Sequence, residues 1–119
     1  MGIQVTWLAH SAFKIEIDDS TILIDPFLTR NPLSPTTAED IDADYILLSH
    51  AHGDHIGDAP EIAARNDAIL VANYEIGNWL RGEHGLQKVH GLNPGGGVQL
   101  PFGRVELTIA HHSSSFNDG

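Results

Sequence analysis

The amino-acid sequence predicts an α/β fold in which a mixed β-sheet carries helices on one face. The order of the predicted elements leads to this prediction. Short segments of strand type come first, then alternate with two segments of helical periodicity, and return near the end. The chain has 119 residues, of which 41% are hydrophobic and 18% are charged, so its composition suits one globular domain.

Three strands are expected in the N-terminal part of the chain, where the sequence is apolar or alternates between apolar and polar residues. They are Val5–Leu8, Ala12–Ile17 and Thr21–Ile24. The polar residues 18–20 join the second and third strands as a hairpin. Residues 29–40, which include Pro32 and Pro35, indicate a long exposed loop.

The remaining elements alternate between strands and helices. The helices are predicted from apolar stripes, with Pro60 in the first turn of one and Gly82 ending the other. In order, the elements are strand Ala43–Ser49, helix Asp58–Arg65, strand Ala68–Ala72, helix Tyr74–Arg81, strand Lys88–His90, and a hairpin of Val98–Leu100 with Val105–Ala110. We expect Trp7, Trp79 and Phe102 in the core.

The composition argues against several classes of protein. The chain has no cysteine, which removes disulfides, thiolate metal sites and cysteine nucleophiles and fits a cytoplasmic location. Its net charge of −10, from 6 basic and 16 acidic residues, argues against a nucleic-acid partner. No apolar run approaches the roughly 20 residues of a membrane span, so no membrane association is expected.

The strongest functional signal is the segment His-Ala-His-Gly-Asp-His at residues 50–55. His50, His52, Asp54 and His55 are all able to bind metal, and imidazole with carboxylate suits Zn²⁺ and neighbouring metals. His50 and His52 are two residues apart, so on an extended backbone they point the same way. Because Gly53 permits a sharp turn, the two pairs of ligands could address two ions about 3.5–4 Å apart.

Alternative interpretations of this segment remain open. A histidine cluster can be a surface accident or the remnant of a tag, although this one is internal and follows an apolar run at residues 45–48. Ligands at the end of a core strand lie where α/β folds place their chemistry. Asp54 can instead be a turn or helix-cap residue.

The segment and its surroundings resemble the metallo-β-lactamase superfamily. Three further segments resemble one branch of it, the uncharacterised metal-dependent hydrolases related to the L-ascorbate-6-phosphate lactonases. These segments are Thr6-Trp7-Leu8-Ala9-His10-Ser11-Ala12-Phe13, Ile22-Leu23-Ile24-Asp25-Pro26-Phe27 and Ala110-His111-His112-Ser113-Ser114. The resemblance runs in order over essentially the whole chain.

The resemblance implies a set of ligands. His50, His52 and a histidine further along would bind one metal ion, and the branch pattern favours His112 for that third position. His111 is the alternative, and alternation along a strand would let only one of the two neighbours reach the metal. Asp54 and His55 would begin a second site, and Asp54 would also orient a water molecule and accept its proton.

The resemblance places two more residues near the metals. Asp25 would accept the free N–H of a ligand histidine and fix its tautomer, or it would only be a turn residue before Pro26. His10 would contact the substrate or support the ligands. Direct ligation of metal by His10 is one alternative, and packing under the loop is another.

The superfamily fold is an αββα sandwich of two similar halves, and this sequence resembles only the first. We therefore expect residues 1–119 to form the N-terminal half of a metallo-β-lactamase-like domain, with the C-terminal half absent from the chain. The complete fold holds two ions, and only one site would be fully supplied here. An isolated half would expose an apolar sheet face, which predicts a homo-oligomer or association with the missing half.

The functional hypothesis is a metal-dependent hydrolase that acts on a small-molecule ester, lactone or phosphoester. The cofactor would be a divalent metal, with Zn²⁺ first and Mn²⁺ or Fe²⁺ as alternatives. One competing hypothesis is a non-catalytic metal-binding half-domain that needs a partner polypeptide. A nucleic-acid-processing member of the superfamily is the other.

Overall fold

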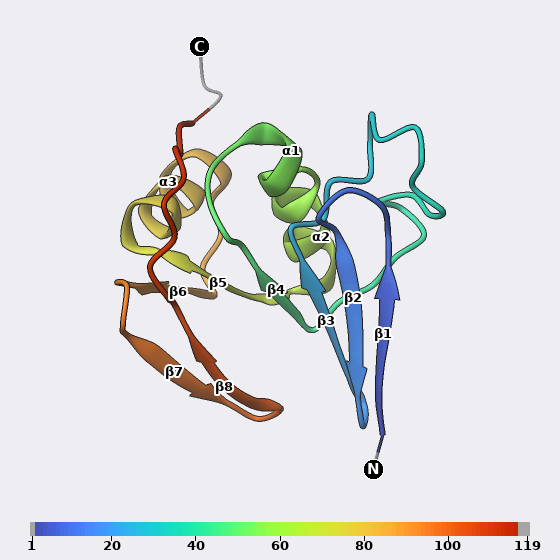
Figure 1. Cartoon of the computed structure of the whole chain (residues 1–119), viewed down its shortest axis with the longest axis horizontal. Helices are drawn as coiled ribbons and strands as arrows, with labels where there is room; N and C mark the ends of the chain where they lie inside the picture. Colours follow the sequence, from blue (N-terminus) through green and yellow to red (C-terminus); the bar gives the residue numbers. More distant parts are fainter. Residues whose placement is uncertain (1, 117–119) are drawn as a thin grey trace.

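The computed structural model describes residues 2–116 and contains a six-stranded mixed sheet with helices on one face (Figure 1). The strands lie across the sheet in chain order. They are β1 (Ile3–Trp7), β2 (Phe13–Ile17), β3 (Ser20–Ile24), β4 (Tyr45–Leu47), β5 (Ile69–Asn73) and β6 (Val89–Leu92). Pairs from β1 to β3 are antiparallel and pairs from β3 to β6 are parallel, which confirms the mixed sheet.

Three helices connect the parallel strands. They are α1 (Gly53–Ile56), α2 (Ala59–Asn66) and α3 (Tyr74–His84). Leu23, Ile46 and Leu70, from three adjacent strands, pack in one cluster with Ile62 of α2 and Leu80 of α3, and all five side chains are fully buried. Burial of each such side chain stabilises the fold by about 1.5–3 kcal/mol. This core holds the helices on one face, as predicted.

The parallel strands β3, β4 and β5 end at the same edge of the sheet, and this edge positions the candidate site. Backbone hydrogen bonds continue past the strand ends, from the N–H of Asp25 to the carbonyl of Leu47 and from Leu48 to Val71. The segments that follow β3 and β4 therefore leave the sheet side by side. Carboxyl ends of parallel strands are where α/β folds place their chemistry.

The opposite face of the sheet is covered only in part. A separate hairpin of β7 (Gly97–Leu100) and β8 (Gly103–Glu106) lies over it, and the ring of Phe102 packs edge-on against Tyr45 at 4.7 Å. Val98 and Val105 of the hairpin also belong to this second apolar cluster. The hairpin thus gives the central strands a cover on this side.

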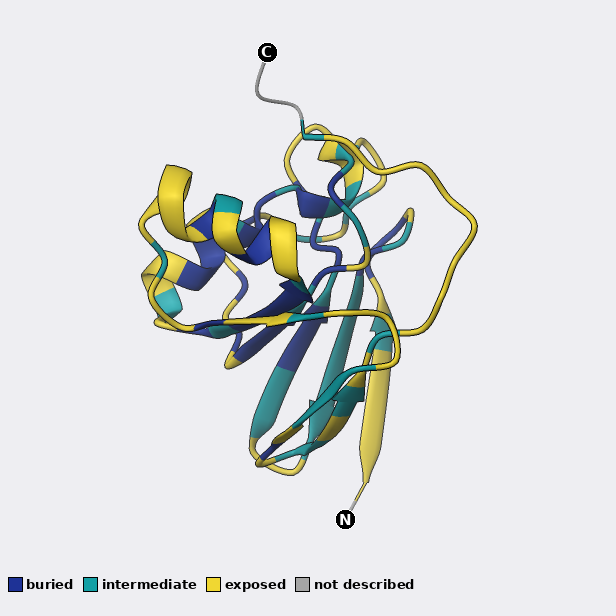
Figure 2. Ribbon diagram, turned by 90° about the vertical axis from the view of Figure 1, so that its left-hand side faces the viewer, coloured by how far each residue is buried: buried dark blue, intermediate teal, exposed yellow. Residues whose placement is uncertain are grey.

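Strand β1 lies beyond that cover. Ile3, Val5 and Trp7 occupy one face of the strand, and they are 65%, 59% and 60% exposed. Figure 2 shows β1 exposed along most of its length, beside the N-terminus. The prediction that Trp7 lies in the core is therefore wrong, because an edge strand outside the hairpin has neighbours on one side only. Trp79 and Phe102 are partly buried.

Helix α3 runs to His84, three residues past Arg81, where it was predicted to end. A side chain added at Gly82 would meet open space, so nothing in the surrounding packing requires the helix to end there. The helix ends at Gly85, which adopts a left-handed conformation and donates its N–H to the carbonyl of Arg81. Glycine favours this conformation because it has no Cβ.

Two other elements, strand β8 and helix α1, differ from the prediction. Strand β8 ends at Glu106, so the strand predicted to reach Ala110 is wrong. Its partner β7 begins at Gly97, opposite Glu106, and Leu107 then bonds to the turn at Gly95 and Gly96. Helix α1 was not predicted, because four residues are too few for a periodic signal.

Among residues 2–116, no helix is long and apolar enough to cross a membrane.

Substitution of Gly57 by alanine should destabilise the fold. Gly57 has a φ of +49°, and an added Cβ would lie 2.5 Å from the Cα of Phe27 and from the carbonyl oxygen of Pro26. Overpacking of this kind costs about 1–3 kcal/mol, which urea denaturation would measure. The matched control is Gly82→Ala in the exposed interior of α3, which should stabilise the protein by about 0.5–1 kcal/mol. Equal stability of the two variants would contradict the close packing at Gly57.

Candidate metal centre

The candidate metal centre lies at the sheet edge where β3 and β4 end. His50 and His52 lie on the short loop between β4 and α1, and Asp54 and His55 lie on α1 itself. His112 comes from the C-terminal segment, which runs past this loop (Figure 1). The backbone N–H of Ala51 donates to the Ser114 hydroxyl at 3.0 Å, and this bond ties the C-terminal segment to the loop.

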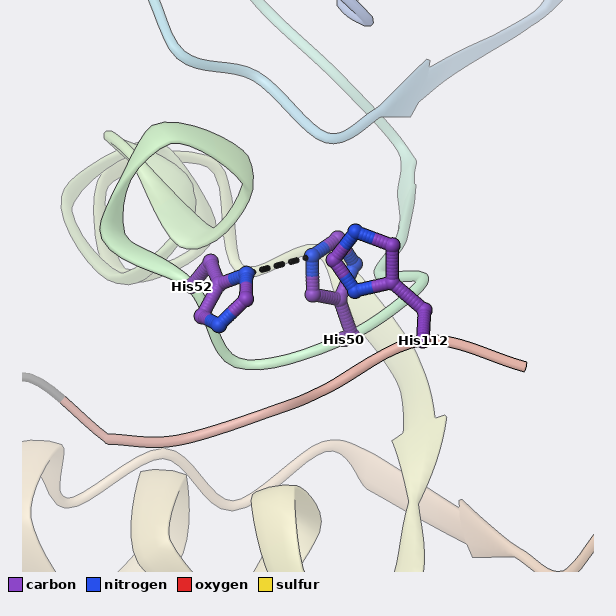
Figure 3. A group of neighbouring side chains, drawn as sticks. All are labelled: His50, His52 and His112. Atoms are coloured by element: carbon purple, nitrogen blue, oxygen red, sulfur yellow. Dashed lines mark hydrogen bonds between the residues drawn. The ribbon is translucent and has the colours of Figure 1, made fainter. Parts of the chain in front are cut away.

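The first group of possible ligands is His50, His52 and His112, whose ligand atoms all lie within 4.8 Å of one another (Figure 3). Nε2 of His50 and Nδ1 of His52 are 3.0 Å apart. Two nitrogens bound to a tetrahedral Zn²⁺ are about 3.3 Å apart for metal–nitrogen bonds of 2.0–2.1 Å. The His50 and His52 rings therefore need only a small adjustment to share one ion, and His112 lies near enough to be the third ligand.

Asp25 accepts hydrogen bonds beside these ligands, and its carboxylate lies within 4.8 Å of ligand atoms of His50 and His55. Its side chain is almost fully buried and accepts hydrogen bonds from the N–H of Ser49 at 2.8 Å, from the Ser49 hydroxyl, and from Nδ1 of His55 at 2.8 Å. A buried carboxylate is tolerated when it is hydrogen-bonded in this way. Asp25 thus links the end of β3 to the loop that carries the ligands.

These bonds set the tautomers of two rings. A carboxylate can only accept, so His55 carries its proton on Nδ1 and presents the lone pair of Nε2. The Ser49 hydroxyl uses its proton on Asp25 and therefore accepts from Nδ1 of His50, 2.8 Å away. His50 also presents the lone pair of Nε2, which is the form that binds a metal.

The second group of possible ligands is His10, Asp54 and His55. Nε2 of His10 donates to Asp54 at 3.0 Å, and Nε2 of His55 lies 3.8 Å from the other Asp54 oxygen. The sequence assigned Asp54 and His55 to a second site and left direct ligation by His10 as an alternative, and the structure brings His10 beside both residues. In the arrangement seen, the proton on Nε2 of His10 supports the Asp54 carboxylate. Direct ligation by His10 would first move that proton to Nδ1.

The turn before β2 brings His10 to this position. Ala9 and His10 have positive φ values of 74° and 52°, and the turn is closed by a bond from the N–H of Leu8 to the carbonyl of Ala12 at 2.8 Å. The Trp7 indole also donates to the His10 carbonyl at 2.9 Å. Non-glycine residues with positive φ are uncommon and cluster at functional sites.

The environment favours the metal-binding forms of two ligands. Partial burial and the neighbouring rings of His55, His112 and His52 lower the pKa of His50, so its imidazole is neutral at pH 7. The hydrogen bond from His10 lowers the pKa of Asp54 below its usual value, which keeps this carboxylate ionised. Nitrogen and oxygen donors in these states fit a divalent metal such as Zn²⁺.

The structure separates the two neighbouring histidines of the C-terminal segment. His112 joins the first group, and its Nδ1 donates to the Ser113 carbonyl at 2.6 Å, which leaves Nε2 free. His111 is exposed and belongs to neither group. The expected strand alternation is wrong, because the segment around both residues has no regular structure. The path of this irregular segment brings His112, and not His111, to the ligand group.

Two cavities flank the candidate centre. One, of about 620 Å³, lies beside Asp54 and is also lined by Arg30. The other, of about 410 Å³, lies beside His50 and His112 and is lined by apolar residues such as Ile109. The cluster of rings therefore lies between two spaces that a small molecule could enter.

Ser49 and Ser114 were not predicted as site residues. Both fix the loop between β4 and α1. The Ser49 hydroxyl donates to Asp25, and the Ser114 hydroxyl, on the C-terminal segment, accepts from the N–H of Ala51. Ser49 directly precedes the histidine segment, and this position was the available signal. No pattern in a single sequence indicates that Ser114 would reach Ala51.

Replacing Asp25 by asparagine should change the tautomer of His55. The asparagine amide would donate where the carboxylate accepted, so the His55 proton would move from Nδ1 to Nε2. Ring ¹⁵N NMR of the chelator-treated protein measures this directly. Asp44→Asn, which alters an acceptor for Thr21 outside the site, is the control. An unchanged His55 spectrum in Asp25→Asn would refute the tautomer assignment.

Comparisons with known proteins identify the family of the chain. Residues 5–117 match the family model described as the metallo-beta-lactamase superfamily. A UPF0173 metal-dependent hydrolase of Bacillus cytotoxicus is 48% identical over 116 residues, which cover 98% of this chain and 50% of that protein. The solved structure of Igni18, a metallo hydrolase from the archaeon Ignicoccus hospitalis, is 41% identical with a TM-score of 0.85, over 98% of this chain and 52% of that one.

More distant structures share the fold alone. CmlA, a diiron β-hydroxylase from Streptomyces venezuelae, is 19% identical with a TM-score of 0.60, over 82% of this chain and 22% of that one. The chain spans about half the length of the curated relatives it matches. Because the family model matches nearly the whole sequence, the chain belongs to the metallo-β-lactamase superfamily.

Proposed function

We propose that this chain supplies the metal centre of a metal-dependent hydrolase. The observation that carries the proposal is the pair of adjoining ligand groups, with the rings of His50 and His55 only 4.1 Å apart between them. The relatives named as metal-dependent hydrolases and the metallo hydrolase Igni18 support it. His50, His52 and His112 would hold one ion, and Asp54 and His55 would hold a second.

The residues of the chain have distinct tasks in this proposal. When bound, the metal ion would act as a Lewis acid and lower the pKa of a water molecule, so that the water could lose a proton at neutral pH and become a nucleophile. Asp54 is half exposed and faces the larger cavity, so it can accept a proton from an incoming water molecule. His10 stabilises the Asp54 carboxylate through the hydrogen bond that its Nε2–H donates. Asp25 keeps the ligand rings oriented.

We propose Zn²⁺ as the metal, because imidazole and carboxylate suit it and no thiolate is present. Mn²⁺ and Fe²⁺ accept the same donors and are the alternatives. For the substrate we propose a small-molecule ester, lactone or phosphoester, since each has a carbonyl or phosphoryl centre that a metal can polarise. The two cavities beside the ligands are of a size suited to such a molecule.

Replacing His52 by alanine should remove metal and hydrolysis together. His52 supplies one of three ligands in the first group, so the metal content should fall by about one ion per chain. Metal content is measured by mass spectrometry and hydrolysis with ester and lactone substrates, with and without chelator. The control is His90→Ala, on an exposed position of β6 away from the ligands. Unchanged metal content in His52→Ala would contradict the assignment.

We propose as a second candidate that the chain binds metal but needs a partner polypeptide for activity. The exposed apolar side chains of β1 favour it, because Ile3, Val5 and Trp7 form a contiguous row without cover. Exposed apolar patches of this kind mark interaction surfaces. The relatives are about twice as long, so their C-terminal half is the partner we propose, with a second copy of this chain as the alternative.

Val5→Glu should weaken this association, because a charge would then be buried in the contact. Sedimentation velocity of the chain alone, and mixed with the C-terminal half of the Bacillus cytotoxicus relative, measures the effect. Gln4→Glu is the matched control, since Gln4 lies on the other face of β1. We expect the chain to form a complex, and Val5→Glu should lower its affinity by about tenfold, or about 1.4 kcal/mol. Gln4→Glu should leave that affinity unchanged. A compact monomer in both experiments would contradict the second candidate.

A further inference from the structure

We propose that Arg30 binds an anionic group of the substrate, a phosphate or a carboxylate, in the cavity beside Asp54. This inference rests on the proposed function, because it concerns the substrate of the same site. Arg30 and Asp54 both line the cavity of about 620 Å³. An arginine at that position would hold the non-reacting, charged end of a molecule whose other end lies at the metal ligands.

Arg30 differs from the other basic residues in having no partner. The chain has six lysines and arginines. Within residues 2–116, the other five make an ion pair or a hydrogen bond with the protein, whereas the Arg30 guanidinium makes neither. These five are Lys14, Arg65, Arg81, Lys88 and Arg104. In a chain with a net charge of −10, a cation without a carboxylate partner beside the site is available for an external anion.

The backbone at Arg30 is also unfavourable for arginine. Arg30 has a φ of +69° and is the third residue of a turn that is closed by a bond from the Asn31 N–H to the Leu28 carbonyl at 3.2 Å. Turns with a positive φ at this position favour glycine or asparagine. Because the guanidinium has no hydrogen-bond or ion-pair partner within residues 2–116, its presence at this position points to a ligand. Backbone strain of this kind is frequent at ligand-binding positions.

The turn is held firmly in place relative to Asp54. The buried Asp58 carboxylate accepts hydrogen bonds from the N–H groups of Leu28 at 3.0 Å and Thr29 at 2.8 Å. Gly57, between α1 and α2, packs so closely on this segment that a Cβ would overlap Phe27. The turn that carries Arg30 and the helix that carries Asp54 therefore form one packed unit.

Arginine suits this task because its planar guanidinium can donate two parallel hydrogen bonds to phosphate or carboxylate oxygens. Such charge-assisted bonds are stronger than neutral ones. Among the substrates proposed above, a molecule with an anionic group would therefore be preferred over a neutral analogue. The shared chemistry is a compact oxyanion, and the test below distinguishes its two sources.

The test is an NMR titration of the ¹⁵N-labelled chain with inorganic phosphate and, in parallel, with acetate. It is done with chelator present, so that no metal ion contributes to binding. We expect saturable shifts at the Arg30 side-chain N–H and at the amides of residues 27–31 and 53–58. The ion with the lower dissociation constant identifies phosphate or carboxylate as the preferred group.

Arg30→Gln should weaken that binding by about tenfold or more, because the guanidinium donors are lost. Arg104→Gln is the matched control, since Arg104 lies on β8 and pairs with Glu106, and it should leave the binding unchanged. Arg30→Gly should lose the binding without lowering the melting temperature, because glycine tolerates the positive φ.

Three results would overturn the inference: no saturable shift around Arg30, equal binding by Arg30→Gln, or a lower melting temperature for Arg30→Gly. The last would show that the arginine side chain stabilises the fold. The metal content of the same samples before chelation tests the proposed function separately. A failure of anion binding is thereby distinguished from a failure of the metal site.

Discussion

The buried carboxylate of Asp25 is the acceptor around which the ligand cluster is arranged. A charge at that depth is unfavourable unless its oxygens are hydrogen-bonded, and here Ser49 and His55 supply three donors. Because a carboxylate only accepts, the direction of each bond is determined, and so is the nitrogen that each ring turns toward the metal position. The Asp25 oxygens thus set the tautomer of His55 directly and that of His50 through the Ser49 hydroxyl. The interaction that joins β3 to the loop after β4 also prepares the ligands.

Residues 25–30 contribute to the site at both ends, with Asp25 at the first and Arg30 at the last. Five residues on, Arg30 lies on a turn that the Asp58 carboxylate and Gly57 hold against the junction of α1 and α2. The ligands of α1 therefore have Asp25 on one side and the Arg30 cavity on the other. One short stretch of chain orients the rings and, in our proposal, recognises the substrate. Its rigidity comes from close backbone packing, which a single added methyl group would disturb.

The two faces of the sheet divide the molecule into a closed side and an open side. The helix face holds the main buried core, and the ligand groups lie at its edge. The other face is covered by the β7–β8 hairpin over the central strands but not over β1. The ligand groups consequently stand on the part of the fold that is packed within this chain. Any contribution from a partner would concern the open face and the enclosure of the substrate rather than the orientation of His50 or His55.

The sequence by itself determined most strands, helix α2 and the contiguous ligands from His50 to His55, because periodicity and short spacings are local properties. Other features depended on contacts between distant parts of the chain. The pairing of His10 with Asp54, the approach of His112 rather than His111, and the bond from Ala51 to Ser114 are of this kind. The end of α3 at Gly85 and the exposure of Trp7 were also decided by surroundings, since a glycine in open space can continue a helix and an edge strand lacks one neighbour. A single sequence encodes which side chains can bind a metal, but only the tertiary structure brings them within bonding distance, because those contacts are set by packing of the whole sheet.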